Sequence, residues 1–299
     1  MAAPMNRLTV ADTRILADGV RGIRLVGELR SYTPGSHIDV LCGTDERGRP
    51  RWNSYSLTGD GFRPEHYAIS VRLGSGGSRW MHRLRPGDVV ETGNPRSGFA
   101  PVQTARHHLL VAAGIGITPI LSHFRAAETW QRSAEVHYIS RDAAHAADLP
   151  GAHITGSRTE FWRALDLTDQ PLGAHLYVCG PKPFMDEVTT RAREAGWPRT
   201  RIHAEHFGAE PATGVPFTAH LRRTGTTLRV PENRTLLDAL ESAGVDVRSR
   251  CRKGVCGECV TAITAGDPLH HDLYLSEDQR TTCITPCVSR ARGTLELDL

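Results

Sequence analysis

The stretch SRCRKGVCGECV, residues 249–260, carries three cysteines, and the stretch TPCVSRA, residues 285–291, carries one more. The first three are separated by gaps of four residues and then two: Cys251, Cys256 and Cys259. Such gaps, followed by a distant further thiol, are an arrangement that binds a [2Fe–2S] cluster. Because a cluster of this kind moves single electrons, the rest of the chain should supply those electrons or receive them.

The geometry of the loop explains the spacing. A short loop wraps one edge of a cluster only if its backbone turns tightly, and Gly254 and Gly257 permit such turns because glycine tolerates positive φ. Cys283 and Cys287 compete for the remaining ligand position, and we favour Cys287 because the residues after it lead into the last predicted strand. A zinc site or a pair of disulfides is the alternative. Zinc sites usually carry two close cysteine pairs, however, and this sequence has one.

The composition is that of an ordinary globular protein. The chain has 299 residues, a hydrophobic content of 39%, a charged content of 23% and a net charge of +3. Its length predicts two or three domains, and without a basic run we expect no nucleic-acid partner. The apolar runs are too short to span a bilayer, and the first residues lack a signal-peptide pattern, so we expect no membrane contact. Seven cysteines, four of them assigned to metal, indicate a reducing compartment, the cytoplasm. We expect a monomer in isolation.

Three blocks of different composition predict a multidomain fold. Residues 1–104 contain short strands separated by Gly/Pro turns, which favours an antiparallel β-barrel. Residues 105–208 alternate strands with helices, which favours an α/β domain with a parallel sheet. Residues 209–216 are typical of a linker, and residues 217–299 combine alternating strands, a helix and the cluster loop. The main helices are expected over residues 119–130, 160–165, 183–195 and 235–243.

A glycine-containing loop in the second block, AAGIGITPI, follows a buried strand and precedes a helix. Gly114 and Gly116 would let the backbone approach a pyrophosphate, and the helix N-terminus would add partial positive charge. Thr118 could donate its hydroxyl, and Pro119 fits the first helical turn. Two structural glycines in a strand–helix turn are the alternative interpretation.

A second loop, Cys179-Gly180-Pro181, ends a later strand, and in a parallel sheet both loops reach the carboxyl edge, where ligands bind. With GIGITP followed by CGP, the sequence resembles the ferredoxin–NADP reductase superfamily. The order of barrel, nucleotide domain and C-terminal plant-type ferredoxin is similar to the phthalate dioxygenase reductase and vanillate demethylase reductase family over essentially the whole chain. This resemblance implies FMN in the barrel, NADH in the middle domain, and an α+β, β-grasp last domain whose [2Fe–2S] cluster passes electrons to a terminal, Rieske-type oxygenase.

The flavin motif of that family is Arg-x-Tyr-Ser, and the corresponding run here is NSYSL. The resemblance implies that Tyr55 packs beside the isoalloxazine and that Ser56 forms a hydrogen bond near the nitrogen that accepts hydride. Ser54 belongs to the same cofactor-binding run. Asn53 replaces the arginine of the motif, a change that affects the phosphate or the ribityl chain rather than the ring. An ordinary edge-strand tyrosine is the alternative for Tyr55.

Because the flavin phosphate is negatively charged, other groups must offset that charge. The candidates are the cations Arg51, Arg72 and Arg79, together with the run Gly76-Gly77-Ser78, whose backbone N–H groups and hydroxyl can bind an anion. The family also places a Gly-Ser pair, here Gly77 and Ser78, at the flavin phosphate. A terminal phosphate fits this compact loop, so we predict FMN rather than FAD.

The predicted chemistry belongs to the cofactors. NADH donates two electrons as hydride, a cluster accepts one at a time, and a flavin can do both, so the protein supplies orientation and electrostatics. By resemblance, Cys179 lies near the nicotinamide and acts with Ser56 at the catalytic centre, and Phe207 covers the flavin. An ordinary buried cysteine is the alternative for Cys179. Arg141, after the second strand, could bind the 2′-phosphate of NADPH, but Asp142 would repel it, so we predict NADH.

Three alternatives remain at this point. The same chain of cofactors could serve a haem monooxygenase or another acceptor. The cluster could instead belong to a redox sensor, although such a protein would not need a complete nucleotide domain. A cationic rim around the cluster loop could steer an acidic partner surface or could be an ordinary solvated edge: Arg248, Arg250, Arg252 and Lys253.

Overall fold

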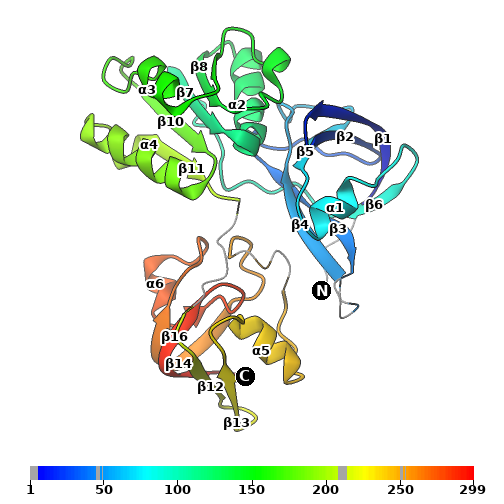
Figure 1. Cartoon of the computed structure of the whole chain (residues 1–299), viewed down its shortest axis with the longest axis vertical. Helices are drawn as coiled ribbons and strands as arrows, with labels where there is room; N and C mark the ends of the chain where they lie inside the picture. The colour runs from blue at the N-terminus through cyan, green and yellow to red at the C-terminus, as the bar shows by residue number, and fades with distance from the viewer. Residues whose placement is uncertain (1–5, 45–47, 49, 208–213, 250–251, 253) are drawn as a thin grey trace. The chain divides into compact units, whose positions relative to one another are not determined.

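The structure, a computed structural model, describes residues 6–44, 48, 50–207, 214–249, 252 and 254–299. The chain divides into two compact units, Met1–Glu205 and His206–Leu299 (Figure 1). Cys251, a predicted cluster ligand, lies outside the described residues, as does most of the predicted linker. None of the described helices combines the length and the apolar character needed to cross a bilayer.

The first sheet is antiparallel and has the strand order β4-β3-β6-β1-β2-β5. Its strands are β1 (Asn6–Ala17), β2 (Val20–Val26), β3 (His37–Thr44), β4 (Pro50–Ser56), β5 (Tyr67–Arg72) and β6 (Val89–Thr92). Leu57, directly after β4, bridges to Ile69 of β5, so the two edges meet and the sheet closes into the predicted barrel. Alternate side chains such as Ile23 and Leu25 fill its interior, and α1 (Gly77–Met81) follows β5.

The second sheet is parallel and has the strand order β11-β10-β7-β8-β9. Its strands are β7 (His107–Ala113), β8 (Ser133–Ile139), β9 (His153–Thr155), β10 (Ala174–Cys179) and β11 (Ile202–Glu205). The helices between them are η1 (Gly114–Gly116), α2 (Ile117–Thr129), η2 (Ala146–Asp148), α3 (Arg158–Ala164), α4 (Lys182–Glu194) and η3 (Arg199–Arg201). Every residue of β7 is buried, because α2 covers one face of the sheet while α3 and α4 cover the other (Figure 1).

The barrel and the parallel sheet belong to one compact unit because polar contacts join them. The hydroxyl of Ser122, on α2, accepts a hydrogen bond from the N–H of Gly35 at 3.0 Å and donates one to the carbonyl of Gly59 at 2.6 Å. Arg125, one turn further along α2, donates to the carbonyl of Thr58 at 2.8 Å. The boundary expected at residues 104/105 therefore separates two sheets within a single unit.

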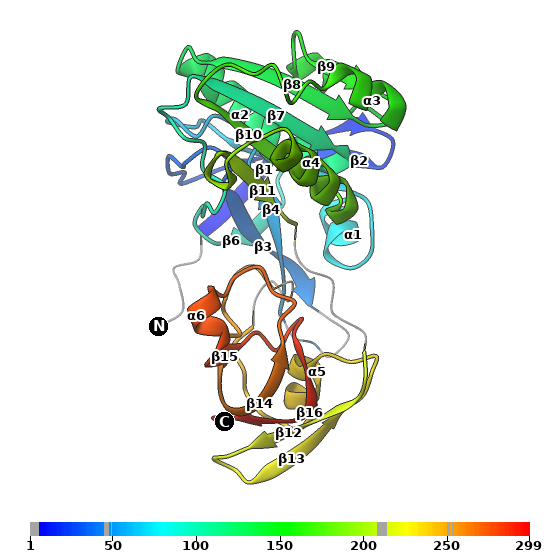
Figure 2. The same ribbon diagram turned by 90° about the vertical axis from the view of Figure 1, so that its left-hand side faces the viewer.

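The second unit contains a mixed sheet with the strand order β13-β12-β16-β14-β15 (Figure 2). Its elements are β12 (Phe217–Leu221), β13 (Thr226–Val230), α5 (Leu236–Ser242), β14 (Thr261–Leu269), α6 (Glu277–Arg280), β15 (Cys283–Ile284) and β16 (Arg290–Leu297). Thr235 caps α5, and Leu236 and Leu240 of this helix pack against Leu295 of β16. The predicted α+β class is confirmed, and each of the main predicted helices is found within two residues of its expected ends.

Histidines buried in the parallel-sheet part should make the fold sensitive to acid. His123, on α2, donates from Nε2 to the carbonyl of Phe99 at 2.7 Å, and burial lowers its pKa to about 3. Below pH 6.5 His123 binds a proton in the unfolded chain but not in the folded chain. The free energy of unfolding therefore falls as pH falls. We expect His123 alone to lower the free energy of unfolding by about 2 kcal/mol between pH 7.5 and pH 5.

This expectation can be checked by urea unfolding of the whole chain at pH 7.5, 6 and 5. The variant His123→Asn removes one titrating group, and its free energy of unfolding should depend less steeply on pH than that of the wild type. His220→Asn, a change on β12 in the other unit, should leave the slope unaltered. Equal slopes for His123→Asn and the wild type would contradict the expectation.

Candidate functional site

Two loops meet at the carboxyl edge of the parallel sheet, as their positions after β7 and β10 predict. Gly114 has a φ of 55°, a conformation that favours glycine. Position 116 must be glycine for a steric reason, because a Cβ atom there would lie 2.3 Å from the carbonyl oxygen of Cys179. A Cβ atom on Gly180 would lie 2.8 Å from Cβ of Ala113. The two loops are therefore packed backbone against backbone.

The start of α2 fits an anion. Within the described residues, no side chain caps the first amides of this helix, and η1 runs directly into it, with backbone N–H groups at the junction bonded to the carbonyls of Gly114 and Ile115. The positive end of the helix dipole is what would attract a phosphate here. Pro119 is the third residue of α2, in the first turn as expected. Thr118 is buried and donates its hydroxyl to the carbonyl of Ile115 at 3.1 Å. In this structure its hydroxyl therefore stabilises the loop.

Two acidic groups lie side by side at the same edge. Cys179 is fully buried and pairs in register with Glu205 of β11. Burial, and then the neighbouring Glu205 carboxylate, raise the pKa of the Cys179 thiol well above its usual range. Burial also raises the pKa of Glu205 to about 8. Both groups are therefore protonated at neutral pH, and Cys179 is suited to packing and orientation rather than to nucleophilic attack.

Glu205 was missed by the sequence interpretation. The residue is half-buried, but its Oε2 atom is shielded from solvent and has no hydrogen-bond partner among the described residues, which is unusual for a buried oxygen. The sequence shows only a charged residue inside the run HAEHFG, and its burial follows from β11, a strand that was not predicted from the sequence. Phe207, predicted to cover the flavin, follows two residues later, but it belongs to the second compact unit and is 40% exposed.

The predicted flavin face gathers residues from β4 and α1. Arg51, Asn53 and Tyr55 alternate along β4, which places their side chains on one face of the strand. A Cβ atom on Gly77 would lie 2.7 Å from Oδ1 of Asn53, and one on Gly76 would lie 3.4 Å from a guanidinium nitrogen of Arg51. Gly76 has a φ of 58°. The structure thus brings Arg51 and the glycine pair together, with Asn53 between the strand and the helix.

The other residues of the run NSYSL have different surroundings. Tyr55 packs against the barrel core, with its hydroxyl 3.7 Å from Sγ of Cys42, and burial raises its pKa. Ser54 donates its hydroxyl to Oδ1 of Asp39 at 2.6 Å, an interaction within the barrel. Ser56 is buried at the end of β4, where it pairs with His37 of β3. The alternation along β4 therefore sends the two serines to the face opposite Tyr55.

The remaining predicted binding residues lie at the ends of secondary-structure elements, in α1 and in the loop after β8. Arg72, at the end of β5, forms an ion pair with Asp142 at 3.4 Å. Its guanidinium nitrogen would lie 3.9 Å from a Cβ atom on Gly114, so it faces the glycine loop. Arg141 is exposed, and Ser78 donates its hydroxyl to the carbonyl of Ser75 at 3.1 Å. Pro181 begins α4 at its N-cap.

The cluster loop in the second unit has the expected backbone. Gly254 and Gly257 have φ values of 66° and 74°, which confirms their predicted role in turning the chain. A Cβ atom on Gly254 would lie 2.6 Å from the side chain of Val288, and one on Gly257 would lie 2.2 Å from the ring of Tyr274. The loop is therefore held closely against the segment that carries Cys287.

The candidate ligands have different environments. Cys259 and Cys287 are both buried and share one apolar cluster with Leu237 and Val288. Cys256, three residues before Cys259, is half-buried in the cluster loop. Cys283 lies on β15, where it pairs with Ala262 of β14. The donor set of soft thiols, close packing and tight turns fits a [2Fe–2S] cluster held by Cys256, Cys259 and Cys287, together with Cys251 from outside the described residues.

The predicted cationic rim is only partly described. Arg250 and Lys253 lie outside the described residues, and Arg248 is exposed. Arg252 forms ion pairs with Asp238 at 3.5 Å and with Glu241, both on α5. Its charge is therefore balanced within the unit. Beside the loop, two large apolar residues are about half exposed: Leu273 and Tyr274.

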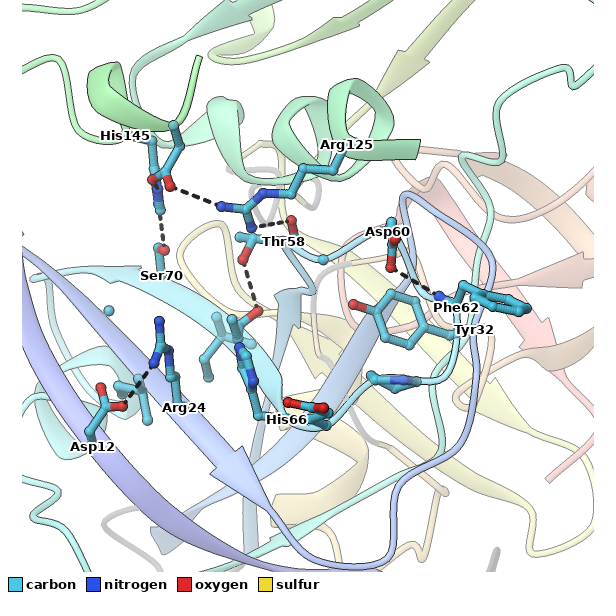
Figure 3. A pocket seen from close by; sticks show the side chains of 18 of the residues that line it. Asp12, Arg24, Tyr32, Thr58, Asp60, Phe62, His66, Ser70, Arg125 and His145 are labelled. Carbon is cyan, nitrogen blue, oxygen red and sulfur yellow. Dashed lines mark hydrogen bonds and ion pairs between the residues drawn. The ribbon is translucent and has the colours of Figure 1, made fainter. Parts of the chain in front are cut away.

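A cavity of about 640 Å³ lies elsewhere in the first unit, lined by β1, β2, β5 and α2 (Figure 3). None of the predicted cofactor residues lines it. Ser70 is 2.8 Å from Nε2 of His145, whose Nδ1 is 2.7 Å from Asp148, and Arg125 binds the same carboxylate at 3.0 Å. This chain of polar contacts links the barrel to the parallel-sheet part and balances its own charges.

Comparisons with known proteins agree with this arrangement. The model for a dimethylamine monooxygenase subunit DmmA-like N-terminal domain matches residues 92–202, and the model for a 2Fe-2S iron-sulfur cluster binding domain matches residues 219–292. The chain is 38% identical to the heme-dependent oxidative N-demethylase beta subunit of Ectopseudomonas mendocina, over 92% of both chains. It is 33% identical to the phthalate dioxygenase reductase of Burkholderia cepacia, over 98% of this chain and 97% of that one.

A solved structure has the same architecture from end to end. It is that of a phthalate dioxygenase reductase, described as a modular structure for electron transfer from pyridine nucleotides to [2Fe–2S]. The two structures align with a TM-score of 0.75 at 33% sequence identity, over 99% of this chain and 98% of that one.

Proposed function

The chain belongs to the phthalate dioxygenase reductase family, and from this membership we propose the route NADH to FMN to [2Fe–2S] to a terminal, Rieske-type oxygenase. It is an oxidoreductase, the reductase component of an oxygenase system. The observation that carries the route is the presence, on one chain, of two glycine loops packed at a sheet edge and of Cys259 buried with Cys287. The flavin supplies the conversion of a two-electron donor into single electrons.

In the barrel, we propose that Arg51 replaces the missing motif arginine. Asn53 fills the space against Gly77, and its neutral amide brings no charge to the phosphate, whereas the Arg51 guanidinium lies beside Gly76. Arg51 would meet the FMN phosphate together with the N–H groups of this glycine pair and Ser78. Tyr55, on the same face of β4, would pack beside the flavin ring, and Arg79 remains a further cation on α1.

Replacing Arg51 by alanine should weaken FMN binding by roughly 10- to 100-fold, because a hydrogen bond to a charged group contributes about 1.5–3 kcal/mol. The dissociation constant can be measured by fluorescence as the apoprotein is reconstituted with FMN. Arg85→Ala, an exposed change in the same domain, is the matched control and should bind FMN normally. If Arg51→Ala binds FMN as tightly as the control, the phosphate is held by other groups.

We propose NADH as the donor, bound by the loop from Gly114 to Pro119 and by Gly180 and Pro181. Asp142 already attracts Arg72 and would repel a 2′-phosphate. Because Cys179 and Glu205 are both protonated, they place no charge at the sheet edge, which suits a nicotinamide ring that must approach the flavin. Comparing flavin reduction rates with NADH and NADPH tests this choice, and a preference for NADPH would assign Arg141 to the phosphate.

A haem-containing oxygenase is the second candidate for the acceptor, because one relative is named a heme-dependent oxidative N-demethylase beta subunit. For either acceptor we propose that the partner docks near Leu273 and Tyr274, the half-exposed apolar residues beside the cluster loop. A redox sensor would have no use for the sheet edge described above. We place the protein in the cytoplasm, where the cluster thiols stay reduced before iron is inserted.

An anaerobic titration with NADH tests the whole route. The purified holoprotein should absorb as a flavin and a [2Fe–2S] cluster together, and NADH should bleach both. Acid extraction should release FMN, since a released FAD would show that the loop at Gly76 was misinterpreted. Bleaching of the flavin alone would contradict electron transfer to the cluster.

A further inference from the structure

A group of side chains able to bind a metal ion lies on the parallel sheet. None of them is among the residues predicted to bind the flavin, the nucleotide or the [2Fe–2S] cluster. Glu135 and His137 alternate along β8, so both point to the face covered by α3 and α4. His153 lies on β9, the edge strand, and its Cα pairs in register with that of His137. Two strands thus present two imidazoles and one carboxylate at the same point.

The donor atoms are close together. One donor atom from each of Glu135, His137 and His153 lies within 4.8 Å of the others. Nε2 of His137 is 2.5 Å from Oε1 of Glu135, and the rings of His137 and His153 stack at 4.7 Å and 16°. His137 is fully buried, whereas His153 is exposed and can rotate. His137 is therefore fixed in position, whereas the orientation of the His153 ring can adjust to a ligand.

A third imidazole, and a fourth possible ligand, approaches from β7. His107 is buried, and its Nδ1 is fixed at 2.8 Å from Oγ of Ser133. Its Nε2 lies 3.8 Å from Oε2 of Glu135 and has no hydrogen-bond partner among the described residues. A buried ring nitrogen without a partner is costly, and here it is directed at the carboxylate that His137 also binds. Nε2 of His107 is therefore a further candidate metal ligand beside Glu135.

We propose that Glu135, His137 and His153 form a binding site for a divalent transition metal of the zinc type, with Nε2 of His107 or a water molecule in the remaining position. Two imidazoles and a carboxylate are a ligand set that zinc accepts readily, and the absence of thiol among them separates this site from the iron ligands. Zinc–ligand bonds of about 2.0–2.2 Å require donors roughly 3–3.5 Å apart, which rotation of His153 can provide.

An unpaired buried nitrogen supports the proposal. A hydrogen-bond network of the described residues leaves Nε2 of His107 without a partner, and an ion at this position would give it one. A bound ion would also fasten the short edge strand β9 to β8, at the two ends of the connection that carries Arg141.

The test uses the intact holoprotein, with iron content measured in every sample so that zinc at vacated cluster cysteines is recognised. After equilibrium dialysis against Zn²⁺ at a series of concentrations, metal analysis should give one zinc per chain with the iron unchanged. His153→Ala, at an exposed position, should weaken zinc binding by roughly 10- to 100-fold or more. His220→Ala, on β12 and bonded to Thr227, is the matched control and should bind zinc normally.

A second variant separates binding from folding. Glu135→Gln keeps the shape and a hydrogen-bond acceptor for His137 while removing the charge, so it should fold and still lose affinity for zinc. Zinc should raise the thermal midpoint of the wild type and of His220→Ala, and should leave those of His153→Ala and Glu135→Gln unchanged. Wild-type zinc binding by His153→Ala, or absence of binding by the wild type with full iron content, would overturn the proposal.

Discussion

Replacing Cys287 by serine should abolish the [2Fe–2S] cluster, whereas replacing Cys283 by serine should leave it in place. Cys287 is buried in the same apolar cluster as Cys259, and its neighbour Val288 packs against Gly254 of the cluster loop. Cys283 is committed to the short strand β15, half-buried and paired with Ala262. A serine hydroxyl at the Cys287 position would be a harder and less acidic ligand than a thiolate, so iron should not be retained.

The measurements are iron content, visible absorption and NADH-dependent reduction of two acceptors. One acceptor should receive single electrons only through the cluster. Cys287→Ser should reduce that acceptor no faster than the background rate. Its NADH-dependent reduction of ferricyanide, which accepts electrons from flavin directly, should continue. Cys283→Ser is the matched control and should equal the wild type in all of these. Cluster loss in Cys283→Ser with retention in Cys287→Ser would reverse the ligand assignment.

Much of the fold follows from local sequence signals. The cysteine spacing with Gly254 and Gly257 predicts the cluster loop, because positive φ values at those positions are a property of the glycines themselves. The largely apolar run HHLLVAA before Gly114 predicts a central parallel strand, and all seven residues are buried in the structure. The helix that follows is found where expected. These features depend on residues close together in sequence, which is why they can be predicted.

Details of the candidate site depend on residues distant in sequence and were not predictable. The Ser54 hydroxyl bonds to Asp39 on the neighbouring strand β3, so its direction is not set by the motif alone. The pair Arg72 and Asp142 joins the barrel to the parallel-sheet part across 70 positions. Glu205 acquires its raised pKa only because the fold buries it, and no local pattern carries that information.

The two glycines of the nucleotide loop illustrate the same division. Gly114 is needed for its own backbone conformation, which a sequence pattern can suggest. Gly116 has an ordinary φ of −60°, and its need for glycine comes from the Cys179 backbone of another strand. A motif records both requirements as the same letter, and only the structure separates them.

Replacing Gly116 by alanine should therefore lower the rate of flavin reduction by NADH by roughly 100-fold, the cost expected when reacting groups are displaced by about 1 Å. The new Cβ atom would lie 2.3 Å from the carbonyl oxygen and 2.7 Å from the Gly180 nitrogen, both backbone atoms that cannot rotate away. The two loops must separate, and the proposed nucleotide surface is built where they meet. Stopped-flow measurement of flavin bleaching at a series of NADH concentrations gives the rate.

The control for this change is Gly156→Ala, because no atom lies within 4 Å of a Cβ placed there and the position is exposed. It should reduce its flavin at close to the wild-type rate. Retained FMN and normal reduction of flavin and cluster by dithionite would show that Gly116→Ala is folded and that only the step from NADH is impaired. If folded Gly116→Ala accepts hydride as fast as Gly156→Ala, the contact between the loops after β7 and β10 does not form the nucleotide site, and NADH must bind elsewhere on the first unit.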